Sequence, residues 1–174
     1  MKAILVVDML KGFCKKGAPL YVGDVCDELI PKMRKFLLKA KEENVPIFYI
    51  CDNHAPDDLE FKMFHPHCIE GTEEAEVMDE FKDIQGEVIK KNRYSGFFNT
   101  DLDSRLKEMG IKKLQVIGVA TDICVLHTVA DARNRDYEVE VIENLVGSFN
   151  KEAHDFALRH IKRVLGATIE RFNE

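Results

Sequence analysis

The sequence predicts one α/β domain built on a doubly wound, mostly parallel sheet that is flanked by helices. Short apolar runs typical of buried strands alternate along the chain with longer segments of helical spacing, and this alternation is typical of a parallel sheet. The length of 174 residues, 45% of them hydrophobic, suffices for one well-buried core but not for two comfortable domains. We therefore expect a single domain over residues 1–174.

Each apolar run is expected to form one strand. The predicted strands cover residues 3–8, 46–51, 87–90, 113–119 and 138–142, with a short final candidate at 167–169. Helical spacing predicts helices at residues 25–44, 100–109, 122–135 and 150–165. Thr100 is suited to cap the start of the second of these helices, and Gly110 directly follows its end as a stop signal.

A long irregular stretch, residues 52–72, interrupts this alternation. It holds three of the six histidines of the chain. Loops of this length are uncommon inside a compact domain and are usually functional. We therefore expect this loop to contribute to a binding or catalytic site.

Composition and charge exclude several kinds of partner. The formal net charge of -6, without a block of like charge, provides no basic field for nucleic acid and no membrane-surface segment. No apolar run approaches the roughly 20 residues needed to span a bilayer. The first residues run straight into a strand pattern without the features of a cleavable signal, so we expect a cytoplasmic protein.

The five cysteines are an odd number without tight spacing, which indicates reduced thiols rather than a disulfide framework. Among them, Cys124 lies where a buried strand is predicted to end and a helix to begin. A thiol in the first turn of a helix feels a partial positive charge that favours the nucleophilic thiolate. The alternative is a buried structural thiol, as free cysteines commonly are. That interpretation is the one we give to Cys14, Cys26 and Cys51.

Two charged residues follow other predicted strands and should meet Cys124 at the carboxyl edge of the sheet. Asp8 closes the first strand and Lys91 follows the strand at 87–90. Taken alone, Asp8 could equally be a turn residue and Lys91 a solvated surface residue. Together the three supply a thiolate nucleophile, a carboxylate that moves protons, and an ammonium that keeps both of these charged.

The long loop carries a second group of candidate residues. Asp52 and His54 extend from the strand at 46–51, where alternate side chains share one face, and Glu60 and His67 follow. Two imidazoles and two carboxylates suit Zn, Fe(II) or Mn as ligands. The alternative is a polar surface loop. His65 is next to His67 and could be mistaken for the ligand. The remaining histidines are interpreted as ordinary surface or core residues: His127, His154 and His160.

These residues resemble the motifs of the isochorismatase-like cysteine hydrolases, and within that superfamily those of the nicotinamidases. The resemblance covers nearly the whole chain and implies an isochorismatase-like, Rossmann-like fold. It also implies that Asp8, Lys91 and Cys124 form a catalytic triad. It further implies a cis peptide between Val119 and Ala120, with the Ala120 and Cys124 amides forming an oxyanion hole. The segments that carry it are Val6-Val7-Asp8-Met9 with Phe13, Lys91-Asn92-Arg93-Tyr94-Ser95-Gly96-Phe97-Phe98, Gly118-Val119-Ala120-Thr121-Asp122-Ile123-Cys124-Val125 and Ala130-Asp131-Ala132.

The resemblance to nicotinamidases rests on the loop. Asp52-x-His54 resembles the metal pair of that family, and residues 64–72 resemble its Trp-Pro-x-His-Cys-Val-x-Gly-Thr stretch, which makes His67 the third ligand. Many relatives have a histidine where Glu60 stands and some have a glutamate, so Glu60 is the fourth candidate ligand. Asn53 and Phe64 stand where the family commonly has tryptophans, so the packing of the substrate ring should differ here.

The function implied by the resemblance is hydrolysis of nicotinamide to nicotinate and ammonia through a cysteine thioester, in salvage of the ring for NAD synthesis. A divalent metal, preferably Zn with Fe or Mn as alternatives, would bind the pyridine nitrogen, and Phe13, Phe64 and Tyr94 would form apolar walls. Family members are commonly homo-oligomers. Two alternatives stay open: a metal-independent hydrolase of another small amide or ureide, and a non-catalytic binding protein on the same fold.

Overall fold

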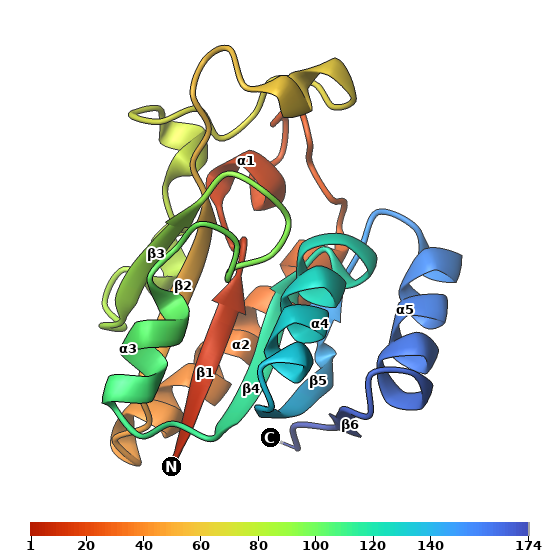
Figure 1. The fold of residues 1–174 in the computed structure, drawn as a ribbon. Coiled ribbons are helices and arrows are strands. Elements are labelled where there is room, and N and C mark those ends of the chain that lie inside the picture. Colours follow the sequence, from red (N-terminus) through yellow and green to blue (C-terminus); the bar gives the residue numbers. More distant parts are fainter. Residues whose placement is uncertain (174) are drawn as a thin grey trace.

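Six parallel strands form one sheet in the computed structural model, which describes residues 1–173 (Figure 1). Their order across the sheet is β3-β2-β1-β4-β5-β6. The order reverses between β1 and β4, and open α/β sheets bind ligands in the crevice outside the strand ends at such a point. The strands are β1 (Lys2–Val7), β2 (Ile47–Asp52), β3 (Glu87–Lys91), β4 (Lys113–Val119), β5 (Glu138–Gly147) and β6 (Thr168–Glu170).

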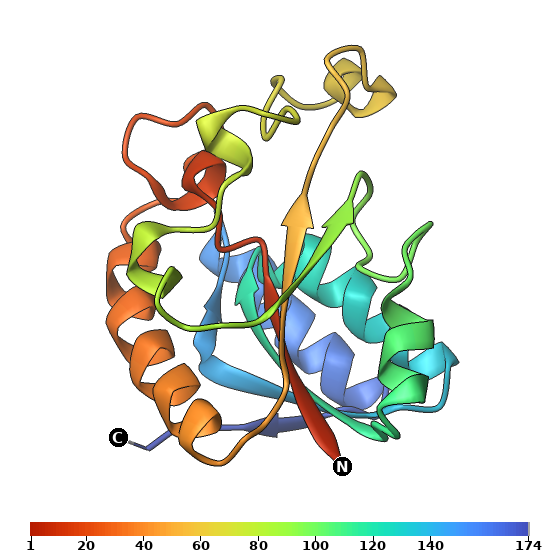
Figure 2. The ribbon, with the colours of Figure 1, turned by 90° about the vertical axis from the view of Figure 1, so that its left-hand side faces the viewer.

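Helices cover both faces of the sheet (Figure 2). Alternation along β1 separates two cores: Ile4 packs in the core that α2 covers, and Leu5 packs in the core that α3, α4 and α5 cover. No helix within residues 1–173 combines the length and the apolar character needed to cross a membrane. The helices are α1 (Lys11–Cys14), α2 (Val25–Glu42), α3 (Leu102–Glu108), α4 (Leu126–Asn134) and α5 (Lys151–Arg163).

The predicted strands are confirmed, with small differences at their ends. β5 is longer than expected and continues to Gly147, and its pairing with β4 resumes after a shift in register. α3 begins at Leu102 rather than at residue 100. Asp101 takes the capping position by its backbone but makes no side-chain cap bond, while the Thr100 hydroxyl donates to the Gly96 carbonyl at 2.6 Å and accepts the Leu102 N–H at 3.4 Å. Gly110 does follow the helix, with a φ of 68° that favours glycine.

The segment that carries Cys124 differs from the expected helix. The predicted helix at 122–135 is split into a π-helical turn, Thr121–Val125, and then α4. Cys124 thus lies in a widened turn and not in the first turn of an α-helix. Such π turns are rare and often occur at functional sites. Short turns were not predicted from hydrophobic periodicity, and the structure adds α1 and 3-10 turns at Leu59–Lys62, Glu73–Ala75 and Asp79–Phe81.

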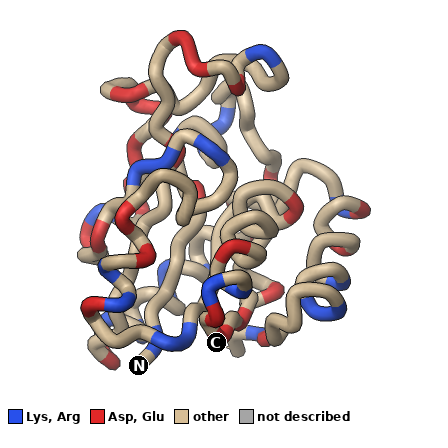
Figure 3. Tube along the Cα trace, viewed as in Figure 1, with Lys and Arg blue, Asp and Glu red and all other residues tan. Residues whose placement is uncertain are grey.

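The charged residues and the cysteines lie as the sequence predicts. Charged residues of both signs are interspersed over the described chain (Figure 3). All five cysteines are free and buried. Cys14, Cys26 and Cys51 belong to the core on the α2 face, as their interpretation as packing residues requires.

Gly118 allows β4 to pass close to β1. Its φ of 123° lies in the region that favours glycine, and a Cβ there would be 2.1 Å from the Val7 carbonyl oxygen. No side chain can be accommodated at that separation. Val7 directly precedes Asp8, and Gly118 directly precedes Val119, so this close approach sets the spacing of two strand ends at the crevice.

Candidate active site

The ends of four adjacent strands bring the predicted triad together. Asp8 directly follows β1, and Lys91 is the last residue of β3. Cys124 lies in the turn that follows β4, and Asp52 ends β2 between the other strands. All four side chains are buried, with Asp8, Lys91 and Asp52 at most 3% exposed. Residues far apart in the sequence thus meet at the crevice where the strand order reverses.

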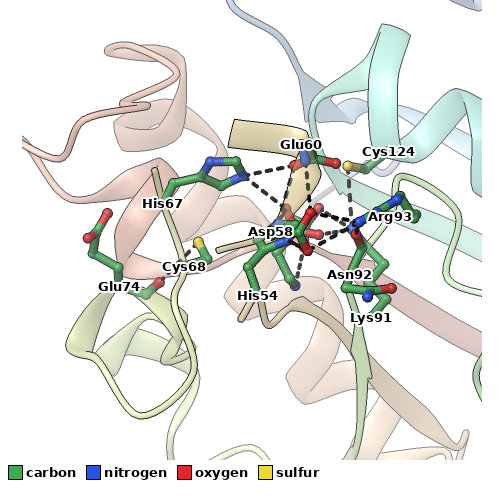
Figure 4. A network of polar contacts seen from close by, with 12 residues as sticks. His54, Asp58, Glu60, His67, Cys68, Glu74, Lys91, Asn92, Arg93 and Cys124 are labelled. Atoms are coloured by element: carbon green, nitrogen blue, oxygen red, sulfur yellow. Dashed lines mark hydrogen bonds and ion pairs between the residues drawn. The ribbon is translucent and has the colours of Figure 1, made fainter. Parts of the chain in front are cut away.

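The Lys91 ammonium is the centre of this group. Its Nζ lies 3.5 Å from Cys124 Sγ (Figure 4). It also lies 3.0 Å from Asp8 Oδ2 and donates to Asp52 Oδ1. Asp8 Oδ1 in turn accepts the backbone N–H of Asp52 at 2.9 Å. One buried cation therefore contacts two carboxylates and a thiol, and such a buried charge cluster is stable only when its members remain paired.

The electrostatics of the site determine which of its side chains are charged at neutral pH. Burial, together with the nearby Asp52 carboxylate, raises the pKa of Asp8 to about 6, although Lys91 opposes this shift. Burial disfavours the charged form of Lys91, but Asp52 and Asp8 outweigh it and raise the pKa of Lys91 well above its usual value. At neutral pH the site therefore holds a carboxylate at Asp8 and an ammonium at Lys91.

The expected thiolate at Cys124 is wrong for this site. Burial raises the pKa of Cys124 well above its ordinary value, and Asp8 and Asp52 add to the rise while Lys91 opposes it. The π turn provides no regular helix start beneath the sulfur, so the helix-dipole argument made from the sequence does not apply. The thiol is therefore protonated at rest, and its proton needs an acceptor such as the Asp8 carboxylate.

The backbone around Cys124 has the form that the resemblance implied. The Val119–Ala120 peptide is cis, and both Ala120 and Cys124 line the cleft. Contacts from the residue after β5 and from α5 hold the π turn in place. Asp122 accepts the hydroxyl of Ser148, and Thr121 Oγ1 lies 2.7 Å from His154 Nδ1. His154, interpreted from the sequence as an ordinary residue, thus contacts the turn that carries the thiol, a role that helical spacing alone could not reveal.

Four residues of the loop and β2 form a second buried group beside the triad. The ligand atoms of Asp52, His54, Glu60 and His67 all lie within 4.8 Å of one another. Both Nε2 atoms face the same two carboxylate oxygens, Asp52 Oδ2 and Glu60 Oε2, at 3.3 to 3.5 Å. A tetrahedral site with ligands at about 2.0–2.1 Å has ligand–ligand separations of about 3.3–3.4 Å. These four separations between imidazole and carboxylate therefore fit binding of a divalent cation.

The orientation of the two imidazoles also fits metal binding. His54 Nε2 is buried and has no hydrogen-bond partner, which is costly unless another group binds it. The His54 Nδ1 atom lies 3.0 Å from Asp58 Oδ2, and the His67 Nδ1 atom lies 2.7 Å from the His65 carbonyl oxygen. Both rings therefore donate through Nδ1–H, which leaves Nε2 of each ring facing the carboxylates as the atom that could bind a cation, as around bound metals.

The charges of this group attract a cation. Burial alone would lower the pKa of His67, but hydrogen bonds to Asp52 and Glu60 raise it to about 10. Burial likewise opposes charge on Asp52, yet the attraction of Lys91 and of the imidazoles holds the pKa of that carboxyl well below its usual range. Asp52 belongs to both groups: Oδ1 accepts Lys91, and Oδ2 faces the imidazoles.

His65 and His127 are excluded from the group. His65 is exposed, and its Nδ1 lies 2.8 Å from the Pro66 carbonyl oxygen. His127 is exposed on α4 with its Nδ1 2.7 Å from the Ile123 carbonyl oxygen, although its ring lies 5.1 Å from that of Tyr94. The choice of His67 over its neighbour His65 therefore agrees with the placement of the two side chains.

A cleft joins the triad and the second group. The three predicted aromatic residues, Phe13, Phe64 and Tyr94, all line it. The rings of Phe64 and Tyr94 meet edge-on with centroids 6.4 Å apart, and Phe13 lies 5.5 Å from the ring of His67. Sequence reasoning missed further apolar residues of the lining, because isolated apolar positions in loops and turns have no periodic signal. These are Leu20, Ile123 and Phe149.

Comparison with known proteins shows that this chain is similar to several amidases. A family model described as the isochorismatase domain matches residues 2–171. The nicotinamidase/pyrazinamidase PncA from Bacillus subtilis has a similar structure, with 32% identity, a TM-score of 0.91, and 98% of this chain and 99% of that chain covered.

Two further solved structures are similar. A pyrazinamidase of Pyrococcus horikoshii in complex with zinc has 31% identity and a TM-score of 0.91, over 98% of this chain and 99% of that one. An N-carbamoylsarcosine amidase from Thermoplasma acidophilum has 34% identity and a TM-score of 0.89, over 99% of this chain and 97% of that one. All three proteins are named as amidases.

Proposed function

This chain belongs to the isochorismatase family of hydrolases, and we propose that within it the protein is a nicotinamidase, which hydrolyses nicotinamide to nicotinate and ammonia. One observation carries the choice of substrate. Members of the triad and of the group of potential metal ligands line one cleft, and Asp52 of the second group also accepts a hydrogen bond from Lys91 of the first. In a planar amide with a basic ring nitrogen, the carboxamide carbon can react with Cys124 while the ring nitrogen binds at the potential metal site.

Asp8 and Cys124 perform the acyl transfer. The Asp8 carboxylate takes the proton of the Cys124 thiol as the sulfur attacks the carboxamide carbon. The Ala120 and Cys124 N–H groups donate to the resulting oxyanion, and each such donor is typically worth about 2.7–4 kcal/mol of barrier. Ammonia then leaves with the proton returned by Asp8, which produces a thioester, and water hydrolyses the thioester to nicotinate and the free thiol.

Lys91 stabilises the charged forms of Asp8 and Cys124 during the reaction. Its ammonium lies 3.0 Å from Asp8 Oδ2 and 3.5 Å from Cys124 Sγ, so it stabilises negative charge on whichever of the two is ionised. Because Lys91 is fully surrounded by protein, this stabilisation is not screened by solvent. The ammonium does not need to transfer a proton itself, and its raised pKa keeps it charged throughout.

Asp52, His54, Glu60 and His67 are proposed to hold a divalent cation. Zinc is favoured over iron or manganese because the ligand spacing suits tetrahedral binding, and a similar pyrazinamidase was solved with zinc. When bound, the ion supplies a Lewis-acidic position for the pyridine nitrogen. The rings of Phe13, Phe64 and Tyr94 flank the path from this position to Cys124 and exclude water from the substrate ring.

Ammonia release from nicotinamide by the purified protein tests the proposal. We expect release that stops after chelation of metal and returns when zinc is added back. No release from a folded, zinc-loaded sample would exclude nicotinamide as the substrate and leave the amide hydrolase assignment in place.

A metal-independent hydrolase of another small amide or ureide is the second candidate. The similarity to an N-carbamoylsarcosine amidase, at 34% identity, favours it. Metal content separates the two candidates, because this alternative requires no bound ion. Turnover of N-carbamoyl compounds that is insensitive to chelation would favour it over the nicotinamidase.

The pH dependence of the reaction reports the state of Asp8. Its carboxylate must be ionised to accept the thiol proton, and its pKa is raised to about 6. Activity is therefore present above this pH and lost below it. We expect kcat/KM for nicotinamide to fall about tenfold per pH unit on the acid side. A profile measured between pH 4.5 and 8 that stays flat to pH 5 would contradict the role of Asp8 as the base.

A further inference from the structure

Asp58 lies outside both groups, yet it contacts two members of the potential metal site. Its side chain is only 3% exposed. Oδ2 lies 3.0 Å from His54 Nδ1, and Oδ1 accepts the backbone N–H of Glu60 at 2.8 Å. We propose that Asp58 is a positioning residue that orients His54 and Glu60 for the metal; this inference rests on the metal-dependent part of the proposed function.

The contact with His54 selects the form of the ring. A carboxylate accepts only, so the hydrogen bond requires the proton of His54 to be on Nδ1, which leaves the Nε2 lone pair directed at Asp52 and Glu60. That Nε2 is the buried atom without a hydrogen-bond partner. His67 has a neutral carbonyl as its Nδ1 partner instead, so of the two rings only His54 donates its Nδ1–H to a carboxylate.

The contact with Glu60 shapes the loop. Asp58 caps the 3-10 turn Leu59–Lys62 by accepting the N–H of its second residue. The turn directs the Glu60 side chain inward, where Oε2 lies 3.3 Å from both His54 Nε2 and His67 Nε2. One carboxylate therefore sets the orientation of an imidazole through Nδ1 and the placement of a second ligand through the backbone.

Arg93 holds Asp58 in this position. Its Nη1 atom lies 2.9 Å from Oδ1 and 3.1 Å from Oδ2 of Asp58 (Figure 4). Arg93 follows the end of β3 by two residues, so the contact joins the loop to the strand that supplies Lys91. The guanidinium also balances the charge of a third carboxylate close to Asp52 and Glu60.

Zinc affinity of the full chain, measured by competition with a chelator, tests the inference. We expect Asp58→Asn to bind zinc about 10- to 100-fold more weakly, the usual effect of losing an outer-shell partner. An asparagine that still caps Glu60 presents its NH₂ group to His54 Nδ1–H, and this clash of donors favours the wrong ring form. Asp57→Asn is the matched control, because Asp57 is exposed on the same loop, and it should bind zinc as the unaltered chain does.

A spectroscopic readout distinguishes positioning from loss of fold. At saturating Co²⁺ the visible bands of Asp58→Asn should differ from those of the unaltered chain, since a reoriented ligand changes the ligand field. Arg93→Gln, which alters a partly exposed residue, should weaken zinc binding by a smaller factor. Wild-type zinc affinity together with a wild-type Co²⁺ spectrum in Asp58→Asn would overturn the inference. Neither readout uses nicotinamide, so tight zinc binding without hydrolysis would defeat the proposed function alone.

Discussion

Replacing Cys124 by alanine is expected to lower kcat for ammonia release from nicotinamide by at least about 10⁴-fold, because no other group in the cleft can form the thioester. Zinc content should be unchanged, since the proposed zinc ligands are Asp52, His54, Glu60 and His67 and do not include the Cys124 sulfur. The thermal unfolding curve should also change little, because the substitution removes a single sulfur atom from the wall of the cleft. Steady-state kinetics, metal analysis and a melting curve on the same sample measure all three quantities.

Cys51→Ala is the matched control for this substitution. Cys51 is also a buried thiol, but it packs in the core on the α2 face and does not line the cleft. Its loss should reduce stability without removing turnover. Retained turnover in Cys124→Ala would remove Cys124 as the nucleophile, and loss of turnover in Cys51→Ala at full folding would show that the assay reports something other than the cleft.

Asp52→Asn is expected to affect metal binding and stability together. Zinc affinity should fall by more than the roughly 100-fold that accompanies loss of an outer-shell partner, because a direct ligand is altered. The free energy of unfolding should also fall, by up to about 3–5 kcal/mol, because the buried Lys91 ammonium loses one of its two carboxylate partners. Chelator competition and denaturant unfolding of the metal-free protein measure the two effects separately.

Glu60→Gln separates these effects. Glu60 faces both imidazoles but makes no contact with Lys91, so its substitution should weaken zinc binding while the metal-free protein keeps most of its stability. If the two variants have equal free energies of unfolding without metal, then the pairing of Asp52 with Lys91 contributes nothing measurable, and the coupling of the two groups through Asp52 is wrong.

The sheet and the triad positions could be predicted from the sequence because they depend on strands. A buried parallel strand is a run of apolar residues, and a charged residue directly after such a run lies at the carboxyl edge of the sheet. Asp8 after β1 and Asp52 at the end of β2 follow this rule, whereas Lys91 ends β3, an edge strand with only Ile89 and Lys91 buried. The choice among the loop histidines came from resemblance to family motifs, since spacing within an irregular segment does not determine which ring points inward.

The ionisation of the site could not be predicted. The thiolate expected at Cys124 depended on a helix start that the structure replaces with a π turn, and burial raises the pKa of the thiol instead. Asp58 and Phe149 were also missed, because a loop carboxylate and a loop aromatic have no local pattern that marks them. Their contacts come from chain segments that only the fold brings together.

The sequence by itself determined the fold class, the strands and the identity of the charged and nucleophilic residues at their ends, because hydrophobic periodicity is a local property of the chain. Only the tertiary structure determined the ionisation and the orientation of those side chains. Desolvation and the distances between Lys91, Asp52 and Cys124 depend on packing between segments tens of residues apart. Those two quantities control the pKa values of the groups, and so the division of the site into a base, a protonated thiol and a cation-binding group.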